Sequence, residues 1–349
     1  MSTLWRGAMF LVFIIFAPPS VAEPDFPSNI PLSPPEHRRG VEQTFLTYPE
    51  WFLVHSPAEY AAYVKDQLPT EFPFIGHIRQ FWGSYGTVYD ASKSYPFNLG
   101  YHVMIMVIGV STTVEYSLKA VYETLFGRLS ELTVTNGMTA EDRLGAKVAQ
   151  DYVDFIRVLP WYEFNFKENL VKLWTETEFW GPNALRKWER KYALTTEYGV
   201  KAIYGWLIKK ATKASYDAPL LATSLVVNRL PDDFPKELPD LRVLQRYSNG
   251  AALILVPRYD AFMYYASELA KRGAKFKEIA GNRSIILISV LAKRDWESAG
   301  NGAKILFTQP LLTQQTKKRV ALVVPVESLA EVLNDISQTG ARLEHVYDY

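Results

Sequence analysis

Apolar side chains recur every three or four positions over the first two thirds of the chain, which is the spacing of amphipathic helices. In the segment 74–89, for example, Phe74, Ile78 and Phe81 fall on one face. Similar stripes continue to about residue 216. The pattern therefore predicts an aromatic-rich helical domain over residues 37–216.

Two sequences in this region predict where helices begin. Ser56 is followed by Pro57 and Glu59, an order typical of an N-cap, a first-turn proline and a capping box. Thr139 stands three residues before Asp142 and predicts a second capping box. We therefore expect one helix to start at each of these positions.

The pattern changes after residue 217, where short runs rich in β-branched and aliphatic residues are separated by turn residues. Two helices, over 259–272 and 326–337, interrupt the strands. The expected strands lie at residues 220–227, 241–247, 252–257, 276–281, 284–292, 303–312, 319–326 and 341–349. Many short strands with few helices predict a mainly antiparallel α+β domain over residues 217–349, and its order is consistent with a ferredoxin-like fold.

One helical segment has an unusual pattern. No polar side chain occurs from Val103 to Val110, so this part must be buried all round, in protein or in lipid. Further on, Glu115 and Lys119 stand four apart and can pair along one side. Two interpretations stay open: a buried central helix, or a membrane helix near residues 99–118.

The amino terminus predicts export. Residues 1–22 have a positive start at Arg6, a short apolar core and small residues before a cleavage site, as in a signal peptide. An uncleaved membrane anchor is the alternative. The prolines of residues 23–36 predict an extended linker.

Composition narrows the functional classes. The formal net charge of +1 gives no overall drive toward nucleic acid. The chain has no cysteine, which excludes disulfides, thiolate metal sites and a cysteine nucleophile. Aromatic residues are abundant, with 21 Tyr, 19 Phe and 9 Trp. Such rings fill large cores or lie at membrane–water boundaries.

Two basic clusters lie in the segment 183–216. The first comprises Arg186, Lys187, Arg190 and Lys191, and the second comprises Lys209, Lys210 and Lys213. We expect them on a solvated helix face, and contact with anionic lipid is the alternative.

The sequence contains no motif that names a reaction. No two histidines stand three or four apart, so no helical metal site is predicted, and no cofactor is expected. A metal site assembled in space is a weaker alternative, from His55, His77, His102, Glu50 and Glu115. For catalysis the weak candidates are Glu50, His55 and Glu115. There is no nucleophile elbow or phosphate loop, and we expect no internal repeat.

Several stretches resemble an uncharacterised family of bacterial proteins that are membrane-associated or exported. The resemblance lies in "LTYPEWFLVHSPAEYAAY", "GVSTTVEYSLKAVYE", "RKWERKYALTTEYGVKAIYGWLI" and the terminal "ARLEHVYDY". It implies a bacterial source and an association with the membrane or envelope. It supplies no catalytic residue.

Together these patterns predict an exported envelope protein in the membrane or periplasm, acting as a binding or structural module with membrane lipid or an envelope protein as partner. Two alternatives stay open. One is an enzyme whose site is built from dispersed residues in the helical domain. The other is a scaffold subunit of a membrane complex.

Overall fold

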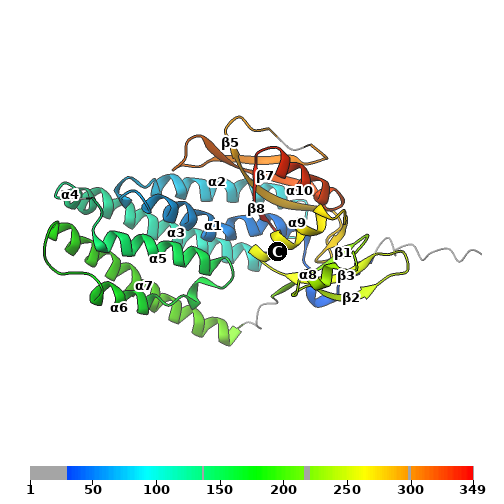
Figure 1. Cartoon of the computed structure of the whole chain (residues 1–349), viewed down its shortest axis with the longest axis horizontal. Helices are drawn as coiled ribbons and strands as arrows, with labels where there is room; N and C mark the ends of the chain where they lie inside the picture. Colours follow the sequence, from blue (N-terminus) through cyan, green and yellow to red (C-terminus); the bar gives the residue numbers. More distant parts are fainter. Residues whose placement is uncertain (1–29, 136, 216–220, 298–299, 349) are drawn as a thin grey trace, which may run out of the picture. The chain divides into compact units, whose positions relative to one another are not determined.

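The computed structural model describes residues 30–135, 137–215, 221–297 and 300–348. The predicted signal peptide, residues 1–22, lies outside them. The helical part comprises η1 (Pro35–His37), α1 (Val41–Val64), η2 (Pro69–Glu71), α2 (Phe74–Ser92), α3 (Leu99–Tyr122), the π-helical turn η3 (Glu123–Gly127), α4 (Arg128–Glu131), α5 (Ala140–Ile156), η4 (Trp161–Glu163), α6 (Phe166–Thr175) and α7 (Ala184–Ser215). Figure 1 shows α1, α5 and α7 side by side in this part.

Helix α1 runs through the region where a helix start was expected. Ser56 lies inside it and makes no N-cap, so that prediction was wrong. Pro49 and Pro57 are both internal, and each removes a backbone hydrogen bond. The helix persists because its aromatic side chains pack on both sides of it, with Phe45 and Trp51 in one cluster and Phe52 in another. The capping box predicted at Thr139 is confirmed at the start of α5.

Helix α3 turns its longest apolar stripe outward. Val103, Val107, Val110, Val114 and Leu118 are all exposed, and Leu118 is 67% accessible. The continuous helical stretch Leu99–Glu131 is long and apolar enough to cross a membrane, yet only 22% of its apolar window is buried within the protein. A buried central helix is therefore the wrong interpretation. Within the part of the chain that the structure describes, other side chains leave this stripe uncovered.

Helix α7 also has inverted polarity, by which we mean that apolar side chains are exposed and charged side chains are buried. Leu185, Trp188, Tyr192, Ile203 and Trp206 are exposed along one side. The first basic cluster, expected on a solvated face, is instead buried: Arg186, Lys187, Arg190 and Lys191. That prediction was wrong because helical periodicity identifies two faces but does not say which one points inward.

Acidic partners explain why the first basic cluster can be buried. Arg186 Nη2 lies 2.8 Å from Asp142 Oδ1 of α5, and Arg190 Nη2 lies 2.9 Å from Glu123 Oε1 of the π-helical turn. Lys191 Nζ lies 3.3 Å from Glu141 Oε1. Each of these three buried cations thus meets a carboxylate on a neighbouring element, as burial of charge requires.

The remainder of the chain is α+β, as predicted, and forms two antiparallel sheets. The first contains β1 (Ala222–Val227), β2 (Arg242–Arg246), β3 (Ala252–Pro257) and β4 (Phe276–Ile279) in the order β2-β3-β1-β4, with α8 (Phe234–Glu237) and α9 (Asp260–Lys271) between strands. The second contains β5 (Ile285–Lys293), β6 (Lys304–Pro310), β7 (Lys317–Pro325) and β8 (Arg342–Val346) in the order β6-β7-β5-β8, with η5 (Val326–Ser328) and α10 (Leu329–Gln338) before β8. All eight predicted strands are present. The first sheet has the strand–helix–strand–strand–helix–strand order of ferredoxin-like domains, and the second sheet extends the domain.

One apolar core joins the two sheets and their helices. It includes Ile254 of β3, Phe262 of α9, Leu322 of β7 and Leu329 of α10, all fully buried. The other face of the second sheet packs against α1, where Leu287, Ala321 and Tyr347 meet Tyr48 and Trp51. Figure 1 shows β5 and β7 close to α2 and α10. The α+β part is thus fixed directly to the helical part.

The described end of the predicted linker is packed against the first sheet. Ser33 is fully buried, and its N–H donates to Glu278 Oε1 of β4 at 2.7 Å. The N–H of Leu32 donates to the second oxygen of the same carboxylate at 3.0 Å. Residues 23–29 lie outside the described residues. The described end of the linker is thus held in place, because Glu278 binds the backbone of Leu32 and Ser33.

Candidate functional site

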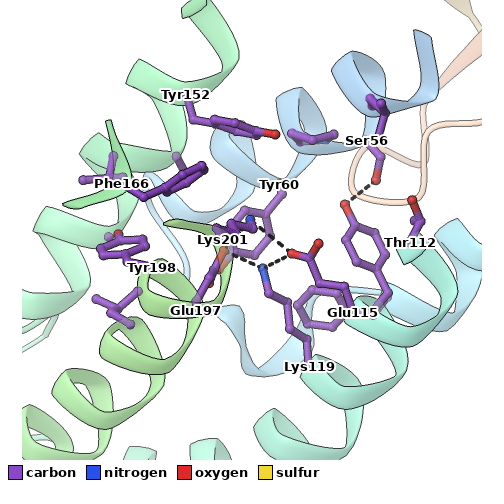
Figure 2. A pocket seen from close by; sticks show the side chains of 18 of the residues that line it. Ser56, Tyr60, Thr112, Glu115, Lys119, Tyr152, Phe166, Glu197, Tyr198 and Lys201 are labelled. Carbon is purple, nitrogen blue, oxygen red and sulfur yellow. Dashed lines mark hydrogen bonds and ion pairs between the residues drawn. The ribbon is translucent and has the colours of Figure 1, made fainter. Parts of the chain in front are cut away.

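A partly open cavity of about 90 Å³ lies among α1, α3, α5 and α7. Aromatic and aliphatic side chains form most of its wall, and charged and hydroxyl groups converge on one region of it, as Figure 2 shows. The aromatic lining consists of Phe52, Tyr60, Phe74, Tyr116, Tyr152, Phe166 and Tyr198. A mostly apolar wall with a few convergent polar groups is typical of small-molecule sites, but such sites usually measure roughly 300–1,000 Å³, so this cavity is small for one.

Four charged side chains form a closed ring at the cavity, two from α3 and two from α7. Within the helices, Lys119 Nζ lies 3.0 Å from Glu115 Oε1, and Lys201 Nζ lies 2.8 Å from Glu197 Oε1. Between the helices, Lys119 Nζ lies 2.9 Å from Glu197 Oε1, and Lys201 Nζ lies 3.1 Å from Glu115 Oε1. We call these four residues the charged ring. Each lysine thus contacts both glutamates.

A short internal repeat builds this ring. Residues 115–122 read EYSLKAVY and residues 197–204 read EYGVKAIY, so both copies follow the pattern Glu-Tyr-x-x-Lys-Ala-x-Tyr. Because residue 115 pairs with 201 and residue 119 with 197, α3 and α7 run antiparallel and the two copies are related by an approximate two-fold axis. The expectation of no repeat was wrong. The repeat is too short to stand out unless the two helices are compared directly.

The repeat places equivalent residues in equivalent surroundings. The first tyrosine of each copy, Tyr116 in one and Tyr198 in the other, is buried and lines the cavity. The four charges are only partly covered: 20% of the Lys119 side chain and 39% of the Glu115 side chain are accessible. The ring is therefore both a connection between α3 and α7 and part of an open surface.

Neighbouring charges keep the ring ionised. Burial opposes ionisation of Glu197, but Lys119 and Lys201 outweigh it and hold the pKa of Glu197 below its usual range. Burial likewise opposes the charge on Lys201, but Glu115 and Glu197 outweigh it and raise the pKa of Lys201. Both residues of α7 are therefore charged at neutral pH, in keeping with their mutual contact.

A chain of buried polar groups leads from the cavity wall toward the second sheet. Ser56 Oγ lies 2.7 Å from the Tyr116 hydroxyl and 3.0 Å from His77 Nδ1. His77 Nε2 lies 3.7 Å from Glu59 Oε2, and Glu59 Oε1 lies 3.1 Å from Arg319 Nη1 of β7. The chain therefore connects the cavity with the α+β part.

The order of Ser56, His77 and Glu59 resembles a nucleophile, a base and an orienting acid. Two observations argue against that role at neutral pH. The His77–Glu59 separation exceeds hydrogen-bond distance. Burial, assisted by Arg319, lowers the pKa of His77 to about 3, so the imidazole is a weak base. We assign these groups to the structure of the cavity wall.

The residues named from the sequence lie in different places. Glu115 belongs to the charged ring. Glu50 accepts a hydrogen bond from the Tyr101 hydroxyl, and His55 Nε2 lies 3.0 Å from the Tyr347 hydroxyl. The structure therefore does not bring the three weak catalytic candidates together.

The weaker alternative of a metal site receives no support from the part of the chain that the structure describes, where no group of three histidine or acidic side chains could hold a metal ion. His77 stacks on Phe72, and His102 stacks on Phe97 with ring centroids 4.5 Å apart. Sequence reasoning missed Lys119, Glu197 and Lys201 as one unit. The signal that could have found them is the Glu-Tyr-x-x-Lys repeat.

No family model, curated protein or solved structure matches this chain. Its function must therefore be inferred from its own geometry.

Proposed function

We propose that this is a membrane-associated binding protein whose outward faces of α3 and α7 lie in lipid. The observation that carries the proposal is the inverted polarity of these two helices. Their apolar side chains are exposed, whereas most of their charged side chains are paired and at least partly covered by the protein. Water favours the opposite arrangement, and a hydrocarbon surrounding favours this one.

The distribution of charge over the other helices supports contact through one face only. Helix α5 exposes Arg143, Lys147, Asp151 and Asp154. Because isolated charges are costly in hydrocarbon, this helix belongs in water. The bundle would then lie on or partly in the bilayer, with the α3–α7 face in lipid and α5 outside it.

Aromatic and basic side chains near the end of α7 support the same orientation. Trp206 is exposed, and Lys210 Nζ lies 4.2 Å from the centre of its indole ring. Tryptophan favours the membrane–water boundary, and a lysine there keeps its ammonium in the polar region. With the signal-like amino terminus, these features support a site of action at the membrane or in the periplasm of a bacterium.

Binding, rather than catalysis, is the activity that the cavity supports. It offers an aromatic wall and the charged ring, whereas His77, the imidazole next to the cavity hydroxyls, has its pKa lowered to about 3. The chain between Ser56 and Arg319 would then hold the cavity in shape.

Single cysteines test the membrane orientation directly, because the native chain has none. Leu118→Cys on α3 and Ile203→Cys on α7 would carry an environment-sensitive fluorophore, and Gln150→Cys on α5 is the matched control. With phospholipid vesicles, we expect a blue shift and quenching by brominated lipid at the first two positions and no change at the third.

The comparison does not depend on the amino terminus, since an anchor there would hold all three variants at the vesicle equally. Equal, water-like emission at all three positions in the presence of vesicles would rule out lipid contact by α3 and α7. Selective protection of the first two positions without vesicles would indicate a protein partner on that face instead.

A further inference from the structure

We propose that the charged ring is a binding site for a primary-ammonium zwitterion, such as a phosphoethanolamine head group, that enters between α3 and α7. The proposal rests on the lipid orientation above for the source of the ligand. It rests on the ring itself for the ligand's chemistry.

The ring has unused hydrogen-bonding capacity of both kinds. All four ion pairs use the Oε1 atoms of Glu115 and Glu197, so the Oε2 atom of each carboxylate takes no part in them. An ammonium group carries three protons, and Lys119 and Lys201 each donate a hydrogen bond to Glu197 Oε1 and lie within 3.1 Å of Glu115 Oε1. The ring can therefore still accept from a donor and donate to an acceptor.

The balance of charge selects the ligand class. Two lysines and two glutamates give the ring no net charge, so it has no overall attraction for an anion or a cation. A ligand of one sign would be attracted by two members and repelled by the other two. A zwitterion can place its ammonium at the carboxylates and its phosphate at the lysines, which gives electrostatic complementarity on both sides.

The aromatic wall distinguishes primary from quaternary ammonium. A quaternary group cannot donate a hydrogen bond and is recognised by open aromatic faces. Here Lys119 Nζ lies 5.4 Å from the Tyr60 ring centre, and Lys201 Nζ lies 5.3 Å from that of Tyr152 and 5.6 Å from that of Phe166. The three aromatic faces next to the ring thus already hold cations, whereas the Oε2 atoms outside the ion pairs can accept N–H donors. Ethanolamine is thus preferred over choline.

The position of the ring gives the ligand a route. The charged ring occupies the space between α3 and α7, and the exposed Val114 and Leu118 on α3 and Val200 on α7 are next to it in sequence. A head group could reach the ring from the lipid-facing side while its acyl chains stay among these apolar side chains.

The test uses the full-length protein in mild detergent and isothermal titration calorimetry with dihexanoyl phosphatidylethanolamine, phosphatidylcholine and phosphatidylglycerol. We expect the ethanolamine lipid to bind roughly tenfold or more tightly than the other two. Equal affinity for all three, or preference for phosphatidylglycerol, would overturn the proposal. Free O-phosphoethanolamine is the fourth probe. Binding of it as tight as that of the lipid would assign the site to a soluble zwitterion.

A ring variant provides the second measurement. Glu115→Gln, Lys119→Met, Glu197→Gln and Lys201→Met together remove the charges with little change of volume, and we expect loss of the ethanolamine preference. The matched control is Lys147→Met with Asp151→Asn on α5, an exposed i,i+4 pair outside the cavity whose Nζ–Oδ2 distance is 3.6 Å. It should bind as the wild type does. The wild-type selectivity remains decisive if the ring variant does not fold.

Vesicle flotation separates this inference from the proposed function. Flotation of wild type and ring variant alike, without a preference for ethanolamine lipid in calorimetry, would overturn the ring proposal and leave membrane association intact. Failure of both to float, with O-phosphoethanolamine still bound by the wild type, would overturn membrane association and retain the zwitterion site.

Discussion

The α+β part and the α3–α7 region arrange polarity in opposite ways. In the α+β part, Ile254, Ile288 and Leu322 are fully buried, as in any water-soluble domain. On α3 and α7, Val110, Leu118 and Ile203 are exposed, while Arg186 and Arg190 are buried with acidic partners. The comparison shows that a hydrophobic stripe does not by itself identify the face that packs against the rest of the protein. The stripe alone does not say whether its face meets protein or lipid.

The largest expected effect is the loss of a buried cation from the helical region. Arg186→Met leaves the buried carboxylate of Asp142 without its cationic partner, while Glu189 keeps Arg190, and we expect the free energy of unfolding to fall by about 3–5 kcal/mol. Urea unfolding of the full-length protein in mild detergent measures it.

The matched control is Arg128→Met, because Arg128 forms an exposed pair with Glu71 at 2.7 Å. Its cost should stay below about 1 kcal/mol. Equal costs for Arg186→Met and Arg128→Met would show that the inward charges contribute no more than surface ones.

A leucine-to-alanine substitution in each region tests the difference between the closed core and the exposed stripe. Leu322→Ala in β7 should lower the free energy of unfolding by about 2–5 kcal/mol, because it leaves a cavity in a closed core. Leu118→Ala on α3 should change it by no more than about 0.5 kcal/mol, since that side chain is 67% accessible. Leu118→Ala should instead weaken vesicle binding in flotation. A large loss of stability in the Leu118 variant would mean that α3 packs against protein.

Two glycines test how closely α3 approaches α2. A Cβ at Gly109 would lie 2.3 Å from Phe81 Cε1, so Gly109→Ala should cost about 1–3 kcal/mol in urea unfolding. A Cβ at Gly83 of α2 would meet nothing within 4 Å. Gly83→Ala should therefore stabilise the helix, by roughly 0.5–1 kcal/mol. Tolerance of alanine at Gly109 would contradict the close packing of α3 on its inner side.

The last expected effect is a dependence of stability on pH. Burial lowers the pKa of His77 to about 3, whereas an unfolded histidine takes up a proton near pH 6.5. Between these values the unfolded state binds the extra proton, so stability falls on acidification by about 1.4 kcal/mol per pH unit. Urea unfolding between pH 6 and 4 should show a shallower slope for His77→Gln. Identical slopes would show that His77 does not contribute to the pH dependence of stability.

Much of the fold could be predicted because local pattern and local structure agree. All eight strands and the helices α9 and α10 follow from short apolar runs and turn residues, and the capping box at Thr139 follows from two side chains three positions apart. The start predicted at Ser56 failed because tertiary packing of α1 overrides the local preference of Pro57.

Most of the candidate site could not be predicted from the sequence pattern. The ring forms because Glu115 and Lys119 contact Glu197 and Lys201. These pairs are about 80 residues apart in the sequence, so only the repeat could have indicated that they are in contact. The buried basic cluster was misassigned because burial of Arg186 depends on Asp142 of α5, which is 44 residues away in the sequence.

The approximate two-fold axis between α3 and α7 has a consequence for how this site can evolve. One chain carries both halves of the charged ring, as two copies of an eight-residue pattern. In a symmetric dimer, each of the two chains would supply one half. A dimer must change both halves of its interface at once, because one gene encodes both. Here Glu115 and Glu197, or Lys119 and Lys201, can diverge independently. The site can therefore become asymmetric one substitution at a time and match a ligand whose two ends differ.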